Sequence, residues 1–430
     1  MTESPRGLVR VIGRWSLAAL MLNTMIGGSI FGLPSVIAVY LGRLSPFAYF
    51  VAFAGIAVIA ACLAEVASYF QEAGGPYLYA RTAFGPFVGI QIGWLTWLSR
   101  ISASAAVANL FTTYLSEFFP SVKASLPRAA VLVLLIAFLA AINYRGVRSG
   151  NWLSNFFTIT KLALLVLFVG GGLTALALHP SIRVVPAQVP ATAANWFEAI
   201  ILLVYAYGGF ESALFVSGEA RDPRKDAPIA LLVALLTATL LYVAVQYVVI
   251  HTLANVAETT KPVVDSARQF LGLAGVSIVA VGTLVSTYGY LGANMLHTPR
   301  ITYAMGERGD FPAFFARIHP RYRTPYLSII AFSLLLVLFS VGANFRWNAS
   351  LSAVSRLFIY GSVAAALPAL RRKYPGAAVF RLPAGMLFVV LGLAFTGVLV
   401  TRMHLAELVV VSITFALGLM NWLWARAHLS

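Results

Sequence analysis

The sequence predicts an all-α integral membrane protein, and three observations lead to this prediction. Sixty per cent of the 430 residues are apolar and ten per cent are charged, with a mean hydropathy of +0.86. These values lie far outside the range of soluble globular proteins. Apolar stretches long enough to cross a hydrocarbon core of about 30 Å recur along the whole chain. Two of these stretches are interrupted by glycine pairs at comparable points.

The apolar stretches predict twelve transmembrane helices joined by short loops. Their approximate bounds are 14–41, 45–71, 83–118, 127–144, 152–178, 194–219, 227–252, 266–305, 324–342, 350–370, 383–402 and 405–425. The third and eighth stretches are longer than a crossing requires, so we expect tilt or extra turns there. Because no linker or low-complexity tract divides the chain, we expect a single membrane domain over residues 1–430.

Glycine interrupts the first and the sixth stretch. The first contains Ile26-Gly27-Gly28-Ser29-Ile30 followed by Pro34, and the sixth contains Tyr205-Ala206-Tyr207-Gly208-Gly209-Phe210-Glu211. A break at membrane depth survives only where the freed backbone groups are buried in protein or line a polar cavity. One glycine pair alone would favour close helix packing instead. Two pairs at corresponding positions favour unwound helices, and unwound helices indicate a ligand site.

The spacing of the breaks predicts an inverted repeat. They lie five stretches apart, and because five is odd, the second unit enters the membrane from the opposite side. We therefore expect one repeat over 14–178 and a second over 194–370, with the ligand near the midplane where the broken helices meet. Helices eleven and twelve, over 383–425, lie outside the repeat.

The formal charge of +16 indicates topology. With the N-terminus in the cytoplasm, eighteen of the thirty Lys and Arg residues fall on the inner side, seven on the outer side and five within helices. This distribution predicts a multi-pass protein of the cell membrane with both termini cytoplasmic and with anionic lipid contacts. It argues against nucleic-acid binding. Cys62 is the only cysteine and the six histidines are scattered, so we expect no metal site and no cofactor.

Around these breaks the chain resembles the amino acid–polyamine–organocation family of transporters, from about Trp15 to Arg381. Residues 26–34 are similar to the family's I-G-[STA]-G-I-F-x-x-P motif, except that its second glycine falls at Ser29 here. Three further segments resemble family signatures: Ala64–Gly85, Glu219–Pro228, and Pro299–Met305 with Asp310-Phe311-Pro312.

The resemblance implies an amino acid permease that works by alternating access, with a five-plus-five core of the LeuT type. A zwitterion can bind a broken helix through backbone donors at one half and backbone acceptors at the other. We place the substrate carboxylate on the N–H groups of Gly28, Ser29 and Ile30. The ammonium is placed on carbonyls of Ile26, Tyr205, Ala206 and Gly208, with Gly27, Tyr207 and Phe210 flanking the site.

Lys161 lies in the fifth stretch with apolar sequence on both sides, and a lysine at membrane depth is a candidate functional residue. It resembles the lysine that sodium-independent members of the family carry there, whose ammonium occupies the place of a sodium ion. The alternative is a lysine that snorkels to the cytoplasmic surface.

Glu211 follows the second break, where the family often carries an acid. It is either a proton carrier or a structural partner of Arg100. Glu65, Arg300 and Arg356 are expected near helix ends, in structural roles or a state-dependent gate. Tyr205 is a gate candidate, because arginine/agmatine antiporters of the family carry a gating aromatic there. Trp97 and Tyr290 are weaker pocket or gate candidates, and packing is the alternative for all three.

The substrate and the coupling remain open at this stage. Few acidic residues in the core favour a neutral or apolar amino acid, while an unpaired Glu211 would favour a cationic amino acid or a polyamine. Exchange and proton symport are both compatible with Lys161. An enzyme is not expected, because no acid, base and metal ligands converge in the sequence. An amino acid sensor without net transport is a further alternative.

Overall fold

The structure is a computed structural model, and it describes residues 14–70, 75–146, 151–211 and 223–429. This part of the chain folds into apolar helices without a strand. Several predicted features lie outside the described residues. They are residues 71–74 of the Ala64–Gly85 segment, the end of the sixth stretch, the beginning of the Glu219–Pro228 segment, and four of the basic residues counted on the inner side, Arg6, Arg10, Arg148 and Arg221.

The helices of the first half coincide with the predicted stretches. They are α1 (Arg14–Met25), α2 (Ser29–Leu41), α3 (Ser45–Ser68), α4 (Gly75–Phe84), α5 (Pro86–Leu115), α6 (Ser125–Arg145) and α7 (Asn151–Leu178). The short helix α4 was not predicted. Gly85, with φ of 93°, separates α4 from α5, so the third helix begins three residues later than expected.

The helices of the second half also lie close to the predicted stretches. Its helices are α8 (Ala193–Tyr207), α10 (Pro223–Thr252), α11 (Pro262–His297), α12 (Pro299–Glu307), α13 (Tyr326–Gly342), α14 (Phe345–Lys373), α15 (Gly385–Val400) and α16 (Leu405–Leu429). The predicted helix over 266–305 corresponds to α11 and α12 together. Within α11, Gly272 adopts φ of 61° and kinks the helix.

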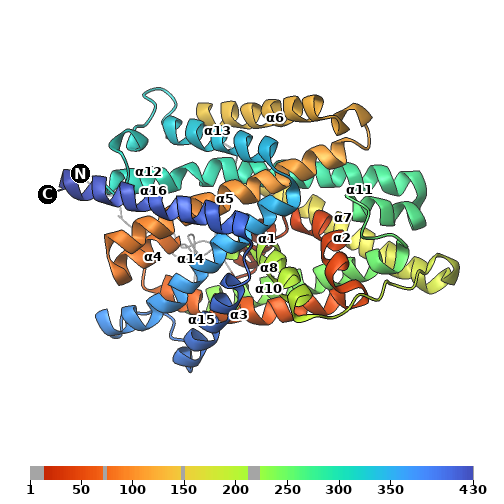
Figure 1. The fold of residues 1–430 in the computed structure, drawn as a ribbon, viewed down its shortest axis with the longest axis horizontal. Helices are drawn as coiled ribbons and strands as arrows, with labels where there is room; N and C mark the ends of the chain where they lie inside the picture. The colour runs from red at the N-terminus through yellow and green to blue at the C-terminus, as the bar shows by residue number, and fades with distance from the viewer. Residues whose placement is uncertain (1–13, 71–74, 147–150, 212–222, 430) are drawn as a thin grey trace, which may run out of the picture.

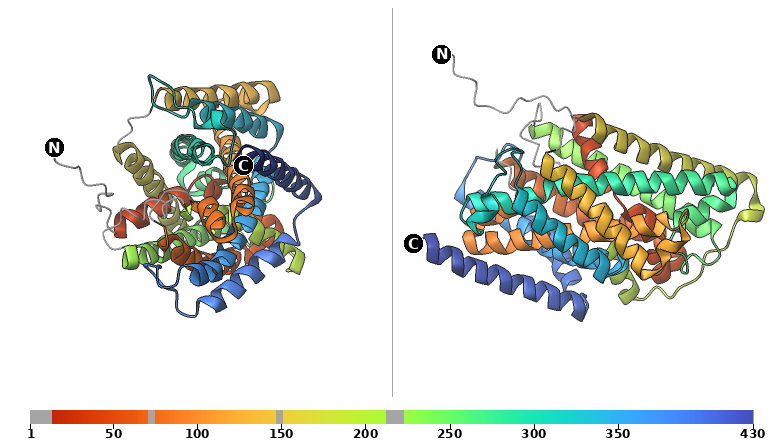
Figure 2. Two further views of the ribbon diagram at one scale, coloured as in Figure 1. Left: turned by 90° about the vertical axis from the view of Figure 1, so that its left-hand side faces the viewer. Right: turned by 90° about the horizontal axis from the view of Figure 1, so that it is seen from above.

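Seven helical segments in the described part are long and apolar enough to cross a membrane, and α8, α13 and α15 are shorter apolar helices. These helices and their length show a multi-pass membrane protein. In Figure 1, α6 and α13 lie along one side of the bundle and α3 and α15 along the opposite side, with α1, α5 and α8 between them. Figure 2 views the same bundle from one end and from above.

Helix α5 forms the centre of the bundle. It is buried along nearly all of its length and packs against α14, α4, α11, α16 and α13. Its polar residues face inward: Ser99 and Ser352 of α14 lie 3.3 Å apart, and Asn109 donates to the Ala343 carbonyl. This central position explains why its sequence is less apolar than that of the lipid-facing helices.

Candidate functional site

The two breaks lie side by side in the structure. Helix α1 ends at Met25 and α2 begins at Ser29, while α8 ends at Tyr207 and the chain turns through Gly208 and Gly209. The Thr24 hydroxyl, near the end of α1, donates to the Gly209 carbonyl at 3.0 Å. The predicted interruptions at both positions are therefore present, and they are in direct contact.

Gly209 permits this contact for two reasons. Its φ of 118° lies in a region of backbone conformation that residues with a side chain rarely adopt. A Cβ at this position would also lie 2.8 Å from the Thr24 carbonyl carbon, so the two backbones could not approach as they do. The glycine is required by both the backbone angle and the packing.

The start of α2 presents three backbone donors to the buried interior. Gly28, Ser29 and Ile30 are buried, and within the described residues their N–H groups have no acceptor. The first N–H groups of any helix lack intrahelical partners, but they are normally satisfied by a cap or by water. Val107 and Leu110 of α5 form the apolar wall beside Gly28. A buried set of donors of this kind is suited to an anion.

The carbonyls at the end of α1 are satisfied by Lys161. Its ammonium lies 2.9 Å from the Ile26 oxygen and 3.1 Å from the Asn23 oxygen. The side chain is 1% exposed and comes from α7. In this structure Lys161 therefore does not snorkel toward the surface but binds the first break.

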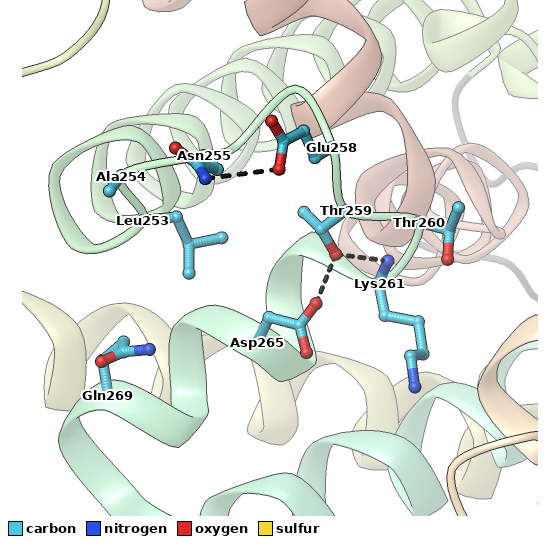
Figure 3. A pocket seen from close by; sticks show the side chains of 9 residues that line it. All are labelled: Leu253, Ala254, Asn255, Glu258, Thr259, Thr260, Lys261, Asp265 and Gln269. Carbon is cyan, nitrogen blue, oxygen red and sulfur yellow. Dashed lines mark hydrogen bonds between the residues drawn. The ribbon is translucent and has the colours of Figure 1, made fainter.

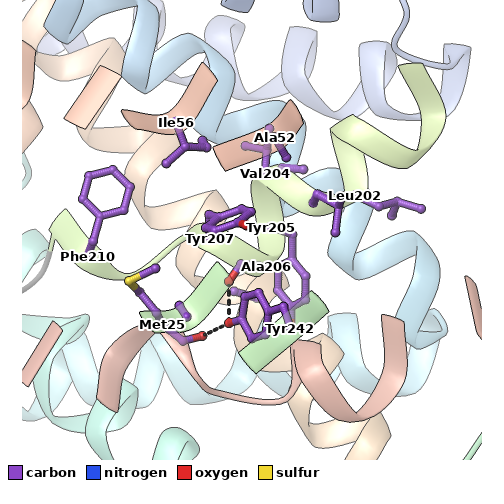
Figure 4. Packing of buried hydrophobic residues seen from close by; sticks show 14 of the residues in the cluster. Met25, Ala52, Ile56, Leu202, Val204, Tyr205, Ala206, Tyr207, Phe210 and Tyr242 are labelled. Carbon is purple, nitrogen blue, oxygen red and sulfur yellow. Dashed lines mark hydrogen bonds between the residues drawn. The ribbon is translucent and has the colours of Figure 1, made fainter. Parts of the chain in front are cut away.

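Tyr242 of α10 joins the two breaks, and no pattern in the sequence indicated this role. Its hydroxyl lies 3.1 Å from the Met25 oxygen and 3.0 Å from the Ala206 oxygen, as Figure 4 shows. It also lies 3.5 Å from the Ser29 hydroxyl. One buried tyrosine thus contacts the end of α1, the start of α2 and the end of α8.

A cluster of charges lies beside the second break. Glu211 pairs with Arg356 of α14 at 3.0 Å and with Arg100 of α5 at 3.2 Å, and it accepts the Gly209 N–H at 2.8 Å. The pair with Arg100, one of the two alternatives for Glu211, is therefore present. The expected position of Arg356 near a helix end was wrong: it lies in the interior of α14, is 2% exposed, and its guanidinium lies directly against Gly208.

The structure brings two of the three candidate gate aromatics to the breaks. The Tyr205 ring packs edge-on against Phe345, with centroids 6.2 Å apart. The Tyr290 ring lies so close to Gly27 that a Cβ there would be 2.6 Å from a ring carbon. Trp97 lies instead in an aromatic cluster with Trp94 and Phe311.

The two remaining aromatic candidates anchor the second break. Phe210 packs against Tyr360 of α14, with centroids 5.7 Å apart. The Tyr207 hydroxyl points away from the first break and donates to the Tyr49 carbonyl of α3 at 2.9 Å. Tyr207 is therefore placed to fix α8 against α3.

Two cavities lie at the ends of the bundle, away from the breaks. One, of about 490 Å³, lies in the loop between α10 and α11 (Figure 3). Its polar groups largely pair with one another, Asn255 with Glu258 and Thr259 with Asp265. Across the described ranges, no three His, Cys, Asp or Glu residues are grouped so that they could hold a metal ion.

The geometry predicts that Gly209→Ala disrupts the site. The substitution strains the backbone by about 1–3 kcal/mol and pushes Thr24 away. We expect a lower melting temperature in detergent and loss of ligand-dependent stabilisation. Gly397→Ala is the matched control, because Gly397 is an exposed helical glycine with open space around it. Equal melting temperatures for the two variants would contradict the packing described here.

Comparison with known proteins identifies the family of this chain. The family model described as amino acid permease matches residues 12–418. The chain is 28% identical to the serine/threonine exchanger SteT of Bacillus subtilis, with 79% of each chain covered. It is 26% identical to the methylthioribose transporter of that organism, over 88% of this chain and 85% of the relative.

A third relative, the branched-chain amino acid permease BcaP of Bacillus subtilis, is 24% identical over 99% of this chain and 95% of its own. The names of the three relatives specify different substrates, although all three proteins are transporters. The family match covers nearly the whole chain, including both breaks. The chain therefore belongs to the amino acid permease family.

Proposed function

We propose that this protein is a sodium-independent secondary transporter of neutral or apolar amino acids, with its substrate bound where the two breaks meet. One observation carries the proposal: the N–H groups of Gly28, Ser29 and Ile30 are buried without an acceptor in the described residues. Leaving a buried donor unpaired costs about 1–3 kcal/mol. A substrate carboxylate at the start of α2 would remove this cost and would also interact favourably with the helix dipole.

The substrate ammonium is expected at the end of α8. The Lys161 ammonium already lies on the Ile26 oxygen, and a second positive charge at that carbonyl would be repelled, which makes it a weaker candidate than the sequence indicated. The carbonyls of Tyr205, Ala206 and Gly208, at the end of α8, are the remaining candidates. Each carbonyl oxygen has two lone pairs, so the bond from Tyr242 to Ala206 leaves room for a second donor.

The proposed architecture is twelve transmembrane helices, with repeats over 14–178 and 194–370 and two further helices over 383–425. The helix contacts support it. An inverted repeat relates the first helix to the sixth and the second to the seventh. The packing of α1 on α10 then corresponds to that of α8 on α3, and both pairs are present. We further propose cytoplasmic termini, from the charge distribution.

The position of Lys161 supports transport without sodium. Its ammonium holds the carbonyls at the end of α1, so a bound cation is not needed to satisfy them. The driving force is then amino acid exchange or a proton gradient. A sensor that binds amino acids without moving them is the alternative of another class.

We predict that proteoliposomes take up neutral amino acids equally well in sodium and in choline buffer. Lys161→Ala should reduce uptake at least tenfold, because two buried carbonyls lose their donor at about 1–3 kcal/mol. Lys123→Ala, at an exposed lysine near the end of α5, is the control. A radiolabelled panel, with and without internal amino acid or an inward proton gradient, gives the readout.

Specific stimulation by sodium would contradict the role of Lys161. Binding of amino acids without flux in any gradient would support the sensor instead. Uptake that requires internal amino acid would identify an exchanger, and uptake driven by the proton gradient would identify a symporter.

Arg356 favours a neutral substrate over a cationic one. Its guanidinium lies against Gly208 and pairs with Glu211, so the carboxylate that would attract a cationic side chain already has a partner. Arg100 contacts the same carboxylate. A second guanidinium or ammonium brought to this place would meet like charge, which is costly in a buried site.

We predict that Arg356→Met allows cationic amino acids to compete for uptake. With one positive charge removed, competition by arginine or lysine should improve about tenfold or more, while Arg356→Lys keeps the charge and the exclusion. The measurement is the concentration of arginine or lysine that halves uptake of a neutral substrate. Wild-type protein that already accepts cationic and neutral amino acids equally would show the proposed substrate class to be wrong.

A further inference from the structure

A cavity of about 480 Å³ lies between the end of α14 and the start of α15, far from the breaks in the sequence and the fold. Arg371 and residues 381–387 line it. Arg371 is in the last turn of α14, and α15 begins at Gly385. The cavity is large enough for a phosphoglycerol group, and it opens to the outside of the bundle.

Positive charge converges on this cavity. The Arg371 guanidinium lies against Gly385, at the N-terminal end of the α15 dipole. Arg381 is exposed and makes no ion pair within the described part of the chain. Arg372 and Lys373, the next two residues of α14, are exposed but do not line the cavity, and the Lys373 ammonium donates to the Thr82 carbonyl of α4.

Among the described residues, one carboxylate contacts these charges. Glu65 of α3 is 0% exposed and binds Arg371 through two contacts of 2.7 and 2.6 Å. It also accepts the Leu382 N–H at 2.7 Å. Glu65 therefore holds the 374–384 connection against α3 and α14, and no described carboxylate pairs with Arg381.

The other side of the cavity is apolar. Met386, Leu387 and Val390, in the first two turns of α15, are 52%, 57% and 60% exposed. The rest of α15 is almost entirely apolar, so this helix faces lipid. The change from arginine to exposed methionine and leucine within a few residues marks the boundary between head groups and hydrocarbon.

We propose that this cavity binds an anionic phospholipid. The phosphate would contact Arg381 and the start of α15, with Arg371 beside it, and the acyl chains would lie along Met386, Leu387 and Val390. Charge complementarity favours an anionic lipid over a zwitterionic one, because Arg381 lines the cavity and pairs with no described carboxylate. The proposal rests on the orientation given under the proposed function, which turns this end of the bundle toward the cytoplasmic leaflet.

Native mass spectrometry of the purified protein tests the proposal. Phosphatidylglycerol should bind more tightly than phosphatidylcholine in its first binding event. Arg381→Gln should weaken phosphatidylglycerol binding about fivefold, the effect of one basic residue at an anionic surface, and leave phosphatidylcholine binding unchanged. Arg381→Lys should retain most of the affinity. Arg317→Gln is the matched control, since Arg317 is also exposed but lies outside the cavity.

Three outcomes would overturn the proposal. Equal weakening by Arg381→Gln and Arg317→Gln would indicate general surface charge and no defined site. Equal binding of the two lipids by the wild type would remove the role of charge. Displacement of the lipid by glycerol phosphate at the same concentration would show that the acyl chains add nothing. Because lipid binding is measured without transport, a protein that carries no amino acid leaves this test unaffected.

Discussion

Buried backbone groups at the two helix breaks are the constraint on which the centre of this protein depends. At membrane depth, N–H and C=O groups need partners that water cannot supply. In this structure carbonyl groups at the breaks have partners, whereas three of the N–H groups do not have one among the described residues. Lys161 and Tyr242 serve the carbonyls at the ends of α1 and α8, while the donors at the start of α2 face the interior without an acceptor in the described residues. These unpaired donors are the basis of the proposal that the substrate carboxylate binds at the start of α2.

The same centre also holds two kinds of fixed charge. The Lys161 ammonium lies on the first break, and the Glu211 carboxylate lies beside the second with Arg356 and Arg100. The pairing fixes α5 and α14 to the chain that follows Gly209. Any movement of this chain during transport would have to break these ion pairs or move α5 and α14 with it. Glu211 therefore couples the site to two of the most buried helices, whichever ion or gradient drives transport.

The sequence predicted those parts of the structure that local pattern determines. Apolar length located the helices, and paired glycines located both breaks. The identity of Lys161 as a buried residue followed from its apolar neighbours. Tyr242 could not be predicted, because a tyrosine in an apolar helix gives no indication of which face meets the breaks. Arg356 was misplaced for a similar reason: its partner Glu211 is 145 residues away, and only the packing of α14 against α8 brings them together.

The proposed binding of the substrate carboxylate at the start of α2 can be seen directly in a cryo-electron microscopy structure of the protein with a transported amino acid. We expect density for the carboxylate within hydrogen-bond distance of the Gly28, Ser29 and Ile30 N–H groups, with the ammonium toward the end of α8. Substrate density elsewhere in the bundle, with these three donors still unpaired, would contradict it.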